Sequence, residues 1–387
     1  MKRIKGIPHN LNEVKIGRVK KGAVPHLLLN DQVFVSDSII TNFLCSTKKV
    51  IVQISSKKNI GSPSIPRVIL DKKDMTNLNE GDIVKINQNG IIEIISSPRS
   101  NDNYIFITNK CNSSCILCPQ SLRNDENYYL QNLKILKLMD KNTLCVGLTG
   151  GEPLLEEEQF LTILDIFNKQ FPKTKLEVLT NGRKLQDKGF VKTIFSINKD
   201  VEFLIPLYSD VEDIHNDLVG NNSYFETLTG IYNLARYSYK IEVRYVLTKK
   251  NFSRISKFPE FVYNNLPFVN HIAFMGMESL GNAIKNINDL WISPLEFYED
   301  INLAFQKINN YDLEASIYNL PHCLVSKSLW KYIRNSISDW KIKYSEKCKN
   351  CILKDICGGF FKSSKRFIEK DLNPIKEDIS KSEIFHV

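Results

Sequence analysis

Short apolar runs separated by polar turns make up the first hundred residues. Regular spacing of such runs is typical of an all-β domain. A strand pair is indicated where two alternating runs flank Asn87-Gln-Asn-Gly90, because an Asn/Gly turn favours a hairpin. A polar, turn-rich stretch at 97–103 follows, so residues 1–100 are predicted to form a small β-rich domain. The expected strands are 14–19, 27–29, 33–36, 50–55, 68–70, 82–86 and 91–95.

From Tyr104 onward, apolar strand patterns alternate with helical patterns. This alternation predicts βα units around a parallel sheet, and six units predict an α/β fold of the partial (β/α)6 barrel type over 104–310. In such barrels the chemistry gathers at the carboxyl ends of the strands. The expected strands are 104–108, 144–148, 175–179, 202–208, 240–246 and 271–275, with helices near 127–139, 155–170, 184–195, 224–237, 254–265 and 294–309.

The alternation stops after Asn310. Residues 311–370 are instead predicted to form a separate cysteine-rich segment, and 371–387 a tail whose pattern predicts no element.

Three thiols crowd the stretch Cys111-Asn-Ser-Ser-Cys115-Ile-Leu-Cys118. Iron-sulfur clusters are usually held by four thiolates, so a loop with three leaves one iron open to a ligand. A structural zinc site normally closes with four protein ligands, which this stretch lacks. Inert core cysteines are the remaining alternative, but they would have no reason to crowd one polar loop.

Four more cysteines follow the barrel region, and they can close one site: Cys323, Cys348, Cys351 and Cys357. Zinc stays open as an occupant, because Cys-Xaa-Xaa-Cys is also a zinc-binding element. Clustered cysteines in a chain of this length favour metal ligation over disulfides. The two remaining cysteines, Cys45 and Cys145, have apolar neighbours and are expected in the core.

The second barrel strand ends in Thr149-Gly150-Gly151-Glu152-Pro153. Paired glycines let the backbone approach a ligand, and the carboxylate can accept from an ammonium group. The same letters also describe a plain turn before a helix. A phosphate-binding loop is not indicated, because no Gly-Lys-Ser/Thr follows.

Polar residues close the next strands as well. Thr180-Asn181 and Ser209-Asp210 follow the third and fourth strands, where ordinary Asx turns would look the same. Arg244 lies within the apolar fifth strand and needs a partner, for which a ligand carboxylate is favoured over a structural acid.

The sixth strand runs into Gly276 and Glu278. Gly276 permits close approach of a ligand. Glu278 faces the same site or serves in an ion pair. His215 and His271 suit proton transfer only by residue type, so neither is assigned a role and no catalytic side chain is identified.

Composition limits the class of protein and its location. The 387 residues, 42% hydrophobic and 25% charged, fit a globular protein of two or three domains. No run approaches the ~18 apolar residues of a membrane span, and residues 1–10 lack a signal-peptide core, so a cytoplasmic protein without membrane partners is expected.

The formal net charge of +9 is unevenly distributed. Residues 1–100 hold 16 Lys and Arg against 8 Asp and Glu, so nearly all of the excess lies there. This favours an acidic partner for the N-terminal domain, unless the lysines only reflect A/T-rich codons.

The spacing Cys111-Xaa3-Cys115-Xaa2-Cys118, followed one unit later by Gly150-Gly151-Glu152-Pro153, resembles the radical S-adenosylmethionine (SAM) superfamily. The resemblance implies a [4Fe-4S] cluster whose open iron binds SAM, and a second, auxiliary [4Fe-4S] cluster on the four later cysteines. It also implies SAM contacts at Leu117, Gly150, Gly151, Glu152, Pro153, Thr180, Asn181, Ser209, Arg244 and Gly276. Leu117 departs from the family, where an aromatic residue is common, yet an aliphatic side chain can still contact adenine.

Further stretches resemble the C-type radical SAM maturase of His-Xaa-Ser peptide systems. They are Cys118–Gln120, Gly147–Leu155, Leu179–Arg183, Ser316–Asn319, Ser336–Trp340 and Cys357–Phe361. This resemblance implies an oxidoreductase that modifies a ribosomally made precursor peptide with His-Xaa-Ser repeats. It further implies a companion maturase and an electron donor such as ferredoxin or flavodoxin as partners.

Two other functions remain open from the sequence. The same barrel could act on RNA or a small metabolite, although no aromatic-rich RNA motif is present and a nucleic-acid partner is not expected. A non-catalytic iron-sulfur or zinc scaffold in a nucleic-acid complex is the second alternative.

Overall fold

The computed structural model describes residues 2–21, 31–37, 50–57, 65–98, 100, 103–120, 128–338 and 340–376. Contacts divide the chain into two compact units. Unit 1 is Met1–Thr108, Glu126–Gly150 and Glu158–Glu177, and unit 2 is Asn109–Asp125, Gly151–Glu157 and Val178–Val387. The expected strand 27–29, Cys45 and residues 377–387 lie outside the described residues.

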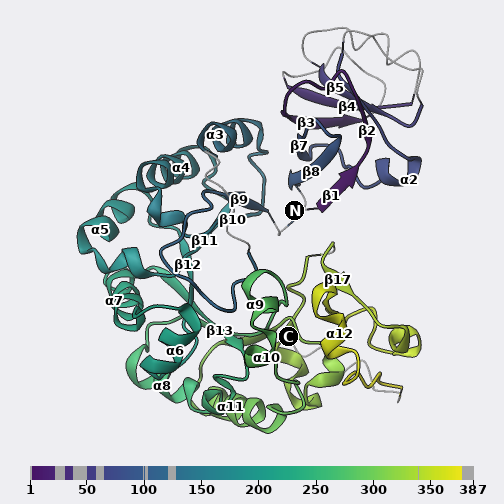
Figure 1. The fold of residues 1–387 in the computed structure, drawn as a ribbon. Coiled ribbons are helices and arrows are strands. Elements are labelled where there is room, and N and C mark those ends of the chain that lie inside the picture. Colours follow the sequence, from purple (N-terminus) through teal and green to yellow (C-terminus); the bar gives the residue numbers. More distant parts are fainter. Residues whose placement is uncertain are drawn as a thin grey trace. The chain divides into compact units, whose positions relative to one another are not determined.

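The N-terminal part of unit 1 is a sheet of eight strands in the order β1-β8-β7-β3-β4-β5-β6-β2 (Figure 1). The expected hairpin is confirmed, since β7 and β8 pair antiparallel and Gly90 of the turn has a φ of 80°. Its elements are β1 (Lys2–Lys5), β2 (Ile7–His9), β3 (Lys15–Lys21), β4 (Gln32–Val35), β5 (Val50–Ser55), β6 (Arg67–Ile69), α2 (Lys72–Met75), β7 (Ile83–Ile86) and β8 (Ile91–Ser96).

The two strands at the ends of this order, β1 and β2, are consecutive in the sequence. β1 pairs antiparallel with β8, and β2 pairs antiparallel with β6, with only Gly6 between them. A Cβ on Gly6 would lie 2.3 Å from Val68 Cγ1, so glycine is required at this corner. The sheet therefore closes on itself around an apolar core that includes Val33, Val52, Ile54, Val84 and Ile92.

The rest of unit 1 carries the first βα elements, β9 (Tyr104–Phe106), α3 (Tyr129–Leu138), β10 (Cys145–Thr149) and α4 (Glu157–Gln170). β9 and β10 pair parallel, and Cys145 is buried on β10. α3 lies against β3, and Lys134 Nζ is 3.0 Å from Asp31 Oδ1. Arg18 Nη2 likewise pairs with Asp140 Oδ2 at 3.3 Å. The closed sheet is thus fastened to α3 within one unit.

The second large sheet has the order β16-β15-β14-β13-β12-β11-β10-β9. Its described pairs are parallel, which confirms the predicted α/β class. All six predicted strands are present, but the sheet continues beyond Asn310 with two more. The further strands are β11 (Lys175–Leu179), β12 (Glu202–Pro206), β13 (Lys240–Leu247), β14 (His271–Gly276), β15 (Ala315–Tyr318) and β16 (Ile333–Arg334).

Helices of unit 2 lie along the outside of its strands (Figure 1). Tyr245 of β13 is fully buried with its ring centroid 4.7 Å from that of Phe258, and Phe274 of β14 lies 5.8 Å from Phe305. Because side chains alternate along a strand, Glu242, Arg244 and Val246 face the opposite, inner side of β13. The outer helices include α5 (Lys188–Ile197), α7 (Tyr224–Ala235), α8 (Phe258–Asn265) and α11 (Tyr298–Asn310). The helices α6 (Glu212–Val219), α9 (Gly281–Lys285) and α10 (Ile287–Leu290) pack against the cysteine-containing segment 111–118.

The C-terminal segment has little regular structure. Its antiparallel pair β17 (Ile342–Lys343) and β18 (Phe360–Phe361) precedes the short helix α12 (Lys365–Ile368). Short 3-10 turns connect many elements: Pro153–Leu155, Arg183–Gln186, Phe252–Arg254, His322–Leu324, Lys327–Tyr332, Glu346–Asn350 and Lys362–Ser364.

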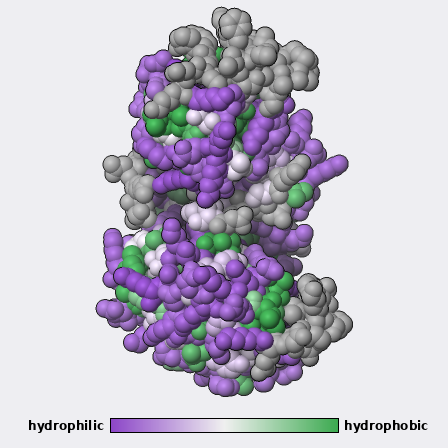
Figure 2. Space-filling view, turned by 90° about the vertical axis from the view of Figure 1, so that its right-hand side faces the viewer, coloured by the Kyte–Doolittle hydropathy of each residue, from purple (hydrophilic) through white to green (hydrophobic). Residues whose placement is uncertain are grey.

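Polar side chains cover most of the coloured surface in Figure 2, with hydrophobic ones in small patches. Within the described residues, no helix combines the length and apolar character needed to span a bilayer.

Candidate functional site

The cysteine loop, Cys111–Cys118, belongs to unit 2 and holds three half-buried thiols. Burial, and then the neighbouring thiols of Cys118 and Cys111, raise the pKa of Cys115 to about 12. Burial, and then the charges of Glu152 and Cys118, raise the pKa of Cys111. The three cysteines share one loop of eight residues, held by the contacts described next. The structure thus brings together the three cysteines that the spacing singled out.

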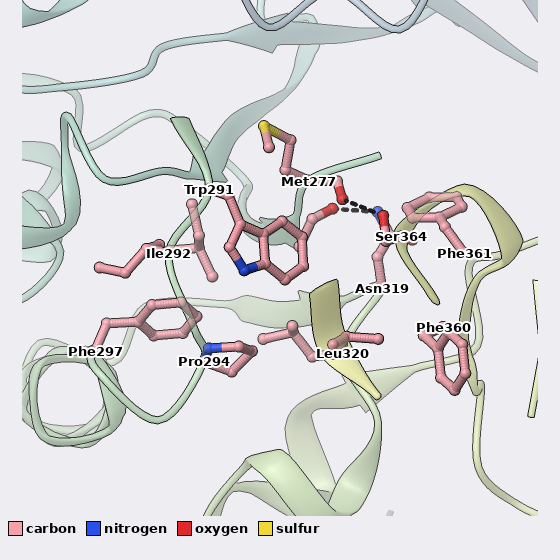
Figure 3. Close-up of a pocket in the computed structure, with 13 residues that line it drawn as sticks. Met277, Trp291, Ile292, Pro294, Phe297, Asn319, Leu320, Phe360, Phe361 and Ser364 are labelled. Carbon is pink, nitrogen blue, oxygen red and sulfur yellow. Dashed lines mark hydrogen bonds between the residues drawn. The ribbon is translucent and has the colours of Figure 1, made fainter. Parts of the chain in front are cut away.

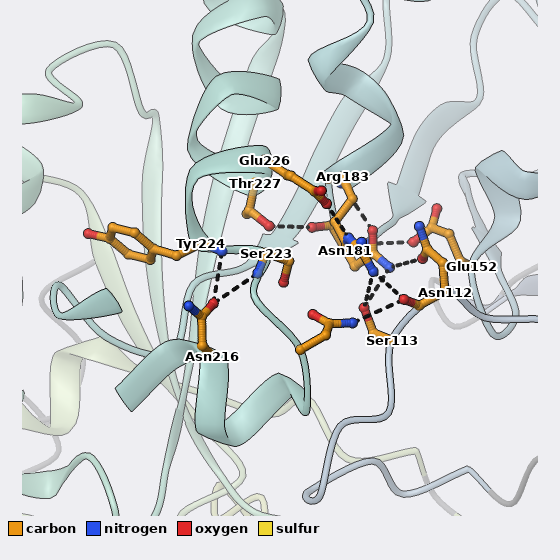
Figure 4. A network of polar contacts seen from close by, with 12 residues as sticks. Asn112, Ser113, Glu152, Asn181, Arg183, Asn216, Ser223, Tyr224, Glu226 and Thr227 are labelled. Carbon is orange, nitrogen blue, oxygen red and sulfur yellow. Dashed lines mark hydrogen bonds and ion pairs between the residues drawn. The ribbon is translucent and has the colours of Figure 1, made fainter. Parts of the chain in front are cut away.

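A first group of hydrogen bonds fixes Asn112 and Ser113, the two residues that follow Cys111. Arg183 Nη1 donates to the Asn112 carbonyl and, at 3.4 Å, to Ser113 Oγ. Asn221 Nδ2 donates to the same carbonyl at 3.0 Å, and Asn181 Nδ2 donates to Asn112 Oδ1 at 2.7 Å. Figure 4 shows Arg183 and Asn181 pointing toward Asn112 and Ser113 of the loop from the end of the third strand.

The second contact comes from the end of α6. Ser114 N donates to the Val219 carbonyl at 3.1 Å, and Ile116 N donates to the Leu218 carbonyl at 3.0 Å. These carbonyls are among the last of the helix and have no partner within it. Gly220 ends the helix with a φ of 71°, and a Cβ there would lie 2.6 Å from the Ser114 carbonyl oxygen. Glycine at this position is therefore needed both for the helix end and for the loop beside it.

The third contact comes from the start of α9. Asn282 N donates to the Cys118 carbonyl at 2.8 Å, and Asn282 Nδ2 donates to the Cys115 carbonyl at 3.2 Å. Asn286 Nδ2 donates to the Ile116 carbonyl at 3.2 Å. These bonds turn loop carbonyls toward the protein. The loop conformation is thus fixed by protein contacts from three separate elements.

The structure gives a packing reason for glycine at positions 150 and 151, besides the ligand contact expected from the sequence. A Cβ on Gly151 would lie 2.2 Å from the Lys110 carbonyl oxygen, and one on Gly150 would lie 2.5 Å from that of Thr108. Glu152 N also donates to the Lys110 carbonyl at 2.7 Å. The glycines therefore let this turn pack directly on the backbone that leads into the cysteine loop.

Glu152 is fully buried, and its carboxylate is occupied by protein donors. Thr180 Oγ1 donates to Oε1 at 2.7 Å, Leu154 N to Oε1 at 3.1 Å, and Asn181 N to Oε2 at 2.7 Å. Burial raises the pKa of this carboxyl group, while the three donors and Arg183 oppose the rise. Pro153 begins the 3-10 turn that follows. Glu152 thus joins the ends of the second and third strands.

Ser209 shows the ordinary turn that the sequence left open. Its side chain is buried, and Oγ accepts from Val211 N at 3.1 Å just before α6. The adjacent Asp210 pairs with Arg254, whose Nε lies 2.9 Å from Asp210 Oδ1. The polar end of the fourth strand therefore starts a helix and carries an ion pair.

Arg244 has a structural acid within reach. Its Nε donates to Glu242 Oε1 at 2.6 Å, and the other oxygen of Glu242 is 2.8 Å from His271 Nδ1. His271 Nε2 in turn lies 3.0 Å from Ser316 Oγ. The His271 hydrogen bond and the Arg244 charge outweigh burial and lower the pKa of Glu242. This network spans the inner face of β13, β14 and β15, so a SAM-carboxylate role for Arg244 stays a prediction.

Leu117 is buried in an apolar group with Tyr208, Leu218 and Met277. Gly276 does not face open space, because a Cβ there would lie 2.7 Å from the Asn319 carbonyl oxygen. Glu278 pairs with Lys341 at 2.9 Å, as its alternative ion-pair role predicted. The contacts of Leu117 and Gly276 with adenine stay predictions.

A pocket lies at the carboxyl ends of β13, β14 and β15. It encloses about 390 Å³ of empty space, part of it open to solvent, and its lining is largely apolar. In Figure 3 the rings of Trp291, Phe297 and Pro294 line one side and Phe360 and Phe361 the other. Met277 belongs both to this lining and to the apolar group around Leu117. The pocket is thus contiguous with the packing behind the cysteine loop.

The C-terminal cysteine group, Cys323, Cys348, Cys351 and Cys357, lines a second pocket of about 380 Å³, also partly open. Burial raises the pKa of Cys323 to about 11, with smaller contributions from the other three thiols. Gly359 N donates to Cys357 Sγ at 3.4 Å. Among the described residues no set of three or more His, Cys, Asp or Glu side chains has single-ion geometry. The metal assignments of both cysteine groups therefore stay predictions.

The residues that fix the cysteine loop were not foreseen as such from the sequence. They are Arg183, Asn221, Asn282 and Asn286. Asparagine is abundant throughout the chain, so no single one stands out. Only the position of Arg183, directly after Thr180-Asn181-Gly182, could have indicated it. His215, to which no role was assigned, is buried and accepts from Tyr208 N at 3.3 Å through Nδ1.

Comparison with known protein families gives no match. An uncharacterized protein of Methanocaldococcus jannaschii is 24% identical over 220 residues, which cover 54% of this chain and 71% of that protein. This similarity is too low to show a family.

Three solved structures are similar to parts of the chain. Streptococcus suis SuiB bound to S-adenosylmethionine has 16% identity and a TM-score of 0.45, with 55% of this chain and 49% of SuiB covered. SuiB bound to its precursor peptide SuiA has 18% identity and a TM-score of 0.46, with 63% and 52% covered. The protein anSMEcpe with bound AdoMet has 19% identity and a TM-score of 0.44, with 55% and 60% covered.

The matched region thus spans only about half the length of SuiB. At these identities and TM-scores no residue role is transferred to this chain.

Proposed function

We propose that this chain is a radical SAM enzyme that modifies a ribosomally made peptide. The observation that carries the proposal is the cysteine loop, whose three thiols lie together on a backbone fixed from three sides. In this proposal a reduced [4Fe-4S] cluster with bound SAM supplies a 5′-deoxyadenosyl radical. The protein holds these groups, orients the peptide and excludes water.

The donor set suits the cluster. Soft thiolates are the usual ligands of iron-sulfur clusters, and Cys111, Cys115 and Cys118 offer three. The loop carbonyls of Cys115, Ile116 and Cys118 accept hydrogen bonds from the protein, so the backbone of the loop is held while its thiols serve as ligands. We assign these three cysteines as the ligands of the SAM-binding cluster.

The proposed SAM contacts divide into direct and supporting residues. The Glu152 side chain already accepts three hydrogen bonds, so we assign it to positioning Thr180 and Asn181. The backbone of Gly150, Gly151 and Pro153, and the side chains of Leu117, Asn181 and Arg244, are the proposed direct contacts. Ser209 and Gly276 remain candidates through their backbone, since the Ser209 hydroxyl caps a turn and the Cα of Gly276 faces Asn319.

We further propose an auxiliary [4Fe-4S] cluster on the C-terminal cysteine group. The shared pocket supports a single site with four thiolate ligands and no open position. Such a closed site suits electron transfer or structural support and does not bind SAM.

The sequence resemblance suggests a precursor peptide with His-Xaa-Ser repeats as substrate, with a companion maturase and a ferredoxin or flavodoxin as partners. SuiB, a structure similar to part of the chain, was solved with its precursor peptide SuiA. The cationic excess of residues 1–100 would attract an acidic peptide or partner, and salt would weaken that attraction over about 8 Å at physiological strength.

Anaerobic reconstitution tests the proposal. Purified protein is loaded with iron and sulfide, reduced with dithionite and incubated with SAM, and 5′-deoxyadenosine is measured by mass spectrometry. The triple variant of Cys111, Cys115 and Cys118 to Ala should produce none, whereas Cys145→Ser should cleave SAM like the wild type. Cleavage of SAM by the triple variant would end the assignment.

A further inference from the structure

We infer that Arg183 is a positioning residue that holds the cysteine loop in its ligating conformation and places a positive charge beside the bound cluster. The inference rests on the proposed function, because it concerns the same loop. The position follows the third strand, in the 3-10 turn Arg183–Gln186, far from the cysteines in sequence.

The geometry of Arg183 supports this role. Its Nε donates to Glu226 Oε2 at 2.5 Å, so one side of the guanidinium is fixed to α7. The other side contacts the Asn112 carbonyl and Ser113 Oγ, the two residues that follow Cys111. A guanidinium presents its donors in a rigid fork, so fixing one side also fixes the other. Arg183 therefore links α7 to the first turn of the cysteine loop.

The turn beneath Arg183 is itself fixed. Gly182 has a φ of 79°, a conformation that favours glycine. Asn181 Oδ1 accepts from Arg183 N at 3.0 Å, and the Asn181 carbonyl accepts from Thr227 Oγ1 at 3.1 Å. A Cβ on Gly230 of α7 would lie 2.3 Å from the Gly182 carbonyl oxygen. α7 thus packs closely on this turn, and the Arg183 side chain leaves it in a defined direction.

Charge is the second argument. The Arg183 side chain is 18% exposed, so solvent screens it only in part. Its guanidinium contacts the Asn112 carbonyl and Ser113 Oγ, so the charge lies against the two residues that follow Cys111. Reduction adds an electron to a cluster, so a nearby cation stabilises the reduced form and makes the potential more positive. Loss of Arg183 should therefore make reduction harder as well as loosen the loop.

The alternative is an ion pair of Arg183 and Glu226 that serves only to stabilise the fold. That alternative explains the contact with Glu226 but gives no reason for the contacts with Asn112 and Ser113. It also predicts that removing the charge leaves the cluster potential unchanged once the protein is folded.

The experiment compares Arg183→Gln, Arg183→Lys and the double variant Arg183→Gln/Glu226→Gln, which leaves no unpaired acid. Lys184→Gln is the matched control, since Lys184 lies in the same turn and pairs with Glu157 at 3.1 Å. Three quantities are measured on the full chain. They are the midpoint potential of the SAM-binding cluster by electron paramagnetic resonance, the rate of iron loss to a chelator, and hydrogen exchange of residues 109–120 without iron. The cluster signal is identified as the one lost in the triple variant of Cys111, Cys115 and Cys118.

We expect Arg183→Gln and the double variant to have a more negative potential. Iron loss and loop exchange should be about tenfold faster, as expected for losing a charge-assisted hydrogen bond. Arg183→Lys should keep most of the potential but lose iron faster, because an ammonium group cannot bridge both partners. Lys184→Gln should match the wild type. An unchanged potential and unchanged iron loss in the folded double variant would overturn the inference.

The outcome is separable from that of the proposed function. If the wild-type protein holds no cluster that depends on Cys111, Cys115 and Cys118, the proposed function fails. Hydrogen exchange of the iron-free loop still tests whether Arg183 holds it, and unchanged exchange in both Gln variants would overturn that part independently.

Discussion

Replacing Glu152 with Gln should loosen the junction of the second and third strands. Two of the three donors, Leu154 N and Thr180 Oγ1, reach the same oxygen, Oε1, and a Gln carbonyl can keep both. The amide group then takes the place of Oε2, so the Asn181 N–H, 2.7 Å from that oxygen in the native site, faces a second donor. A buried donor left unpaired costs about 1–3 kcal/mol.

Hydrogen exchange measures this cost locally, which suits a chain of two units better than a global unfolding curve. The Asn181 amide should exchange about 5 to 150 times faster in Glu152→Gln, the factor that corresponds to 1–3 kcal/mol. Glu152→Ala removes all three acceptor contacts and should exceed the Gln variant. Glu156→Gln is the control, because the nearby Glu156 pairs with the half-exposed Lys110 at 3.0 Å and surface ion pairs contribute little.

A different result would refute the reasoning. If Asn181 exchange is unchanged in Glu152→Gln while affinity for SAM falls sharply, then the carboxylate binds the SAM ammonium group directly. That is the role the Gly-Gly-Glu-Pro motif alone suggested.

Three further predictions follow from the inner face, a buried histidine and the C-terminal cysteines. Arg244→Gln should weaken the binding of SAM about tenfold or more, as measured by calorimetry. Binding of 5′-methylthioadenosine, which has no carboxylate, should not change. Equal weakening for both ligands would mean that Arg244 serves only as the ion-pair partner of Glu242. Burial lowers the pKa of His215 from 6.5 to about 4, so the unfolded state binds its proton first and stability should fall as pH drops from 6.5 to 4. The free energy of unfolding should fall by about 3 kcal/mol over this range in denaturant titrations, and His215→Gln should remove this pH dependence. If His215→Gln leaves the pH dependence unchanged, the histidine is protonated in the folded protein. Changing the C-terminal cysteine group to Ser should halve the bound iron and spare uncoupled SAM cleavage, whereas stoichiometric zinc in anaerobically purified protein would contradict the auxiliary cluster.

The sequence predicted the parallel sheet well because its strands have clear apolar patterns and turn residues at their ends. β11 begins and ends where the pattern placed it, Lys175–Leu179. β15 was missed because it has only four residues and carries Ser316 on its inner face. Its place in the sheet depends on pairing with β14, a contact that no local pattern records.

The candidate site was predictable in its residue types but not in its contacts. Spacing alone singled out the thiols, since ligands on one loop must be close in sequence. The glycines of Gly150-Gly151 were also found, and the structure adds a reason for them that the sequence did not indicate, because a Cβ on either would meet the backbone of Thr108 or Lys110. Arg183 and Asn282 act on the loop from distant segments. Such long-range polar contacts leave no periodic signal, so they could not be derived from a single sequence.

The closure of the N-terminal sheet at Gly6 has a consequence for how this region folds. Lys2 pairs with Ile94, and Ile7 pairs with Ile69, so the first strand is made before either of its partners leaves the ribosome. Both seams close only after long loops have formed, and such distant pairings slow folding. Removing residues 2–9 would unpair the edges of β8 and β6 at once, and unpaired edges invite association between chains.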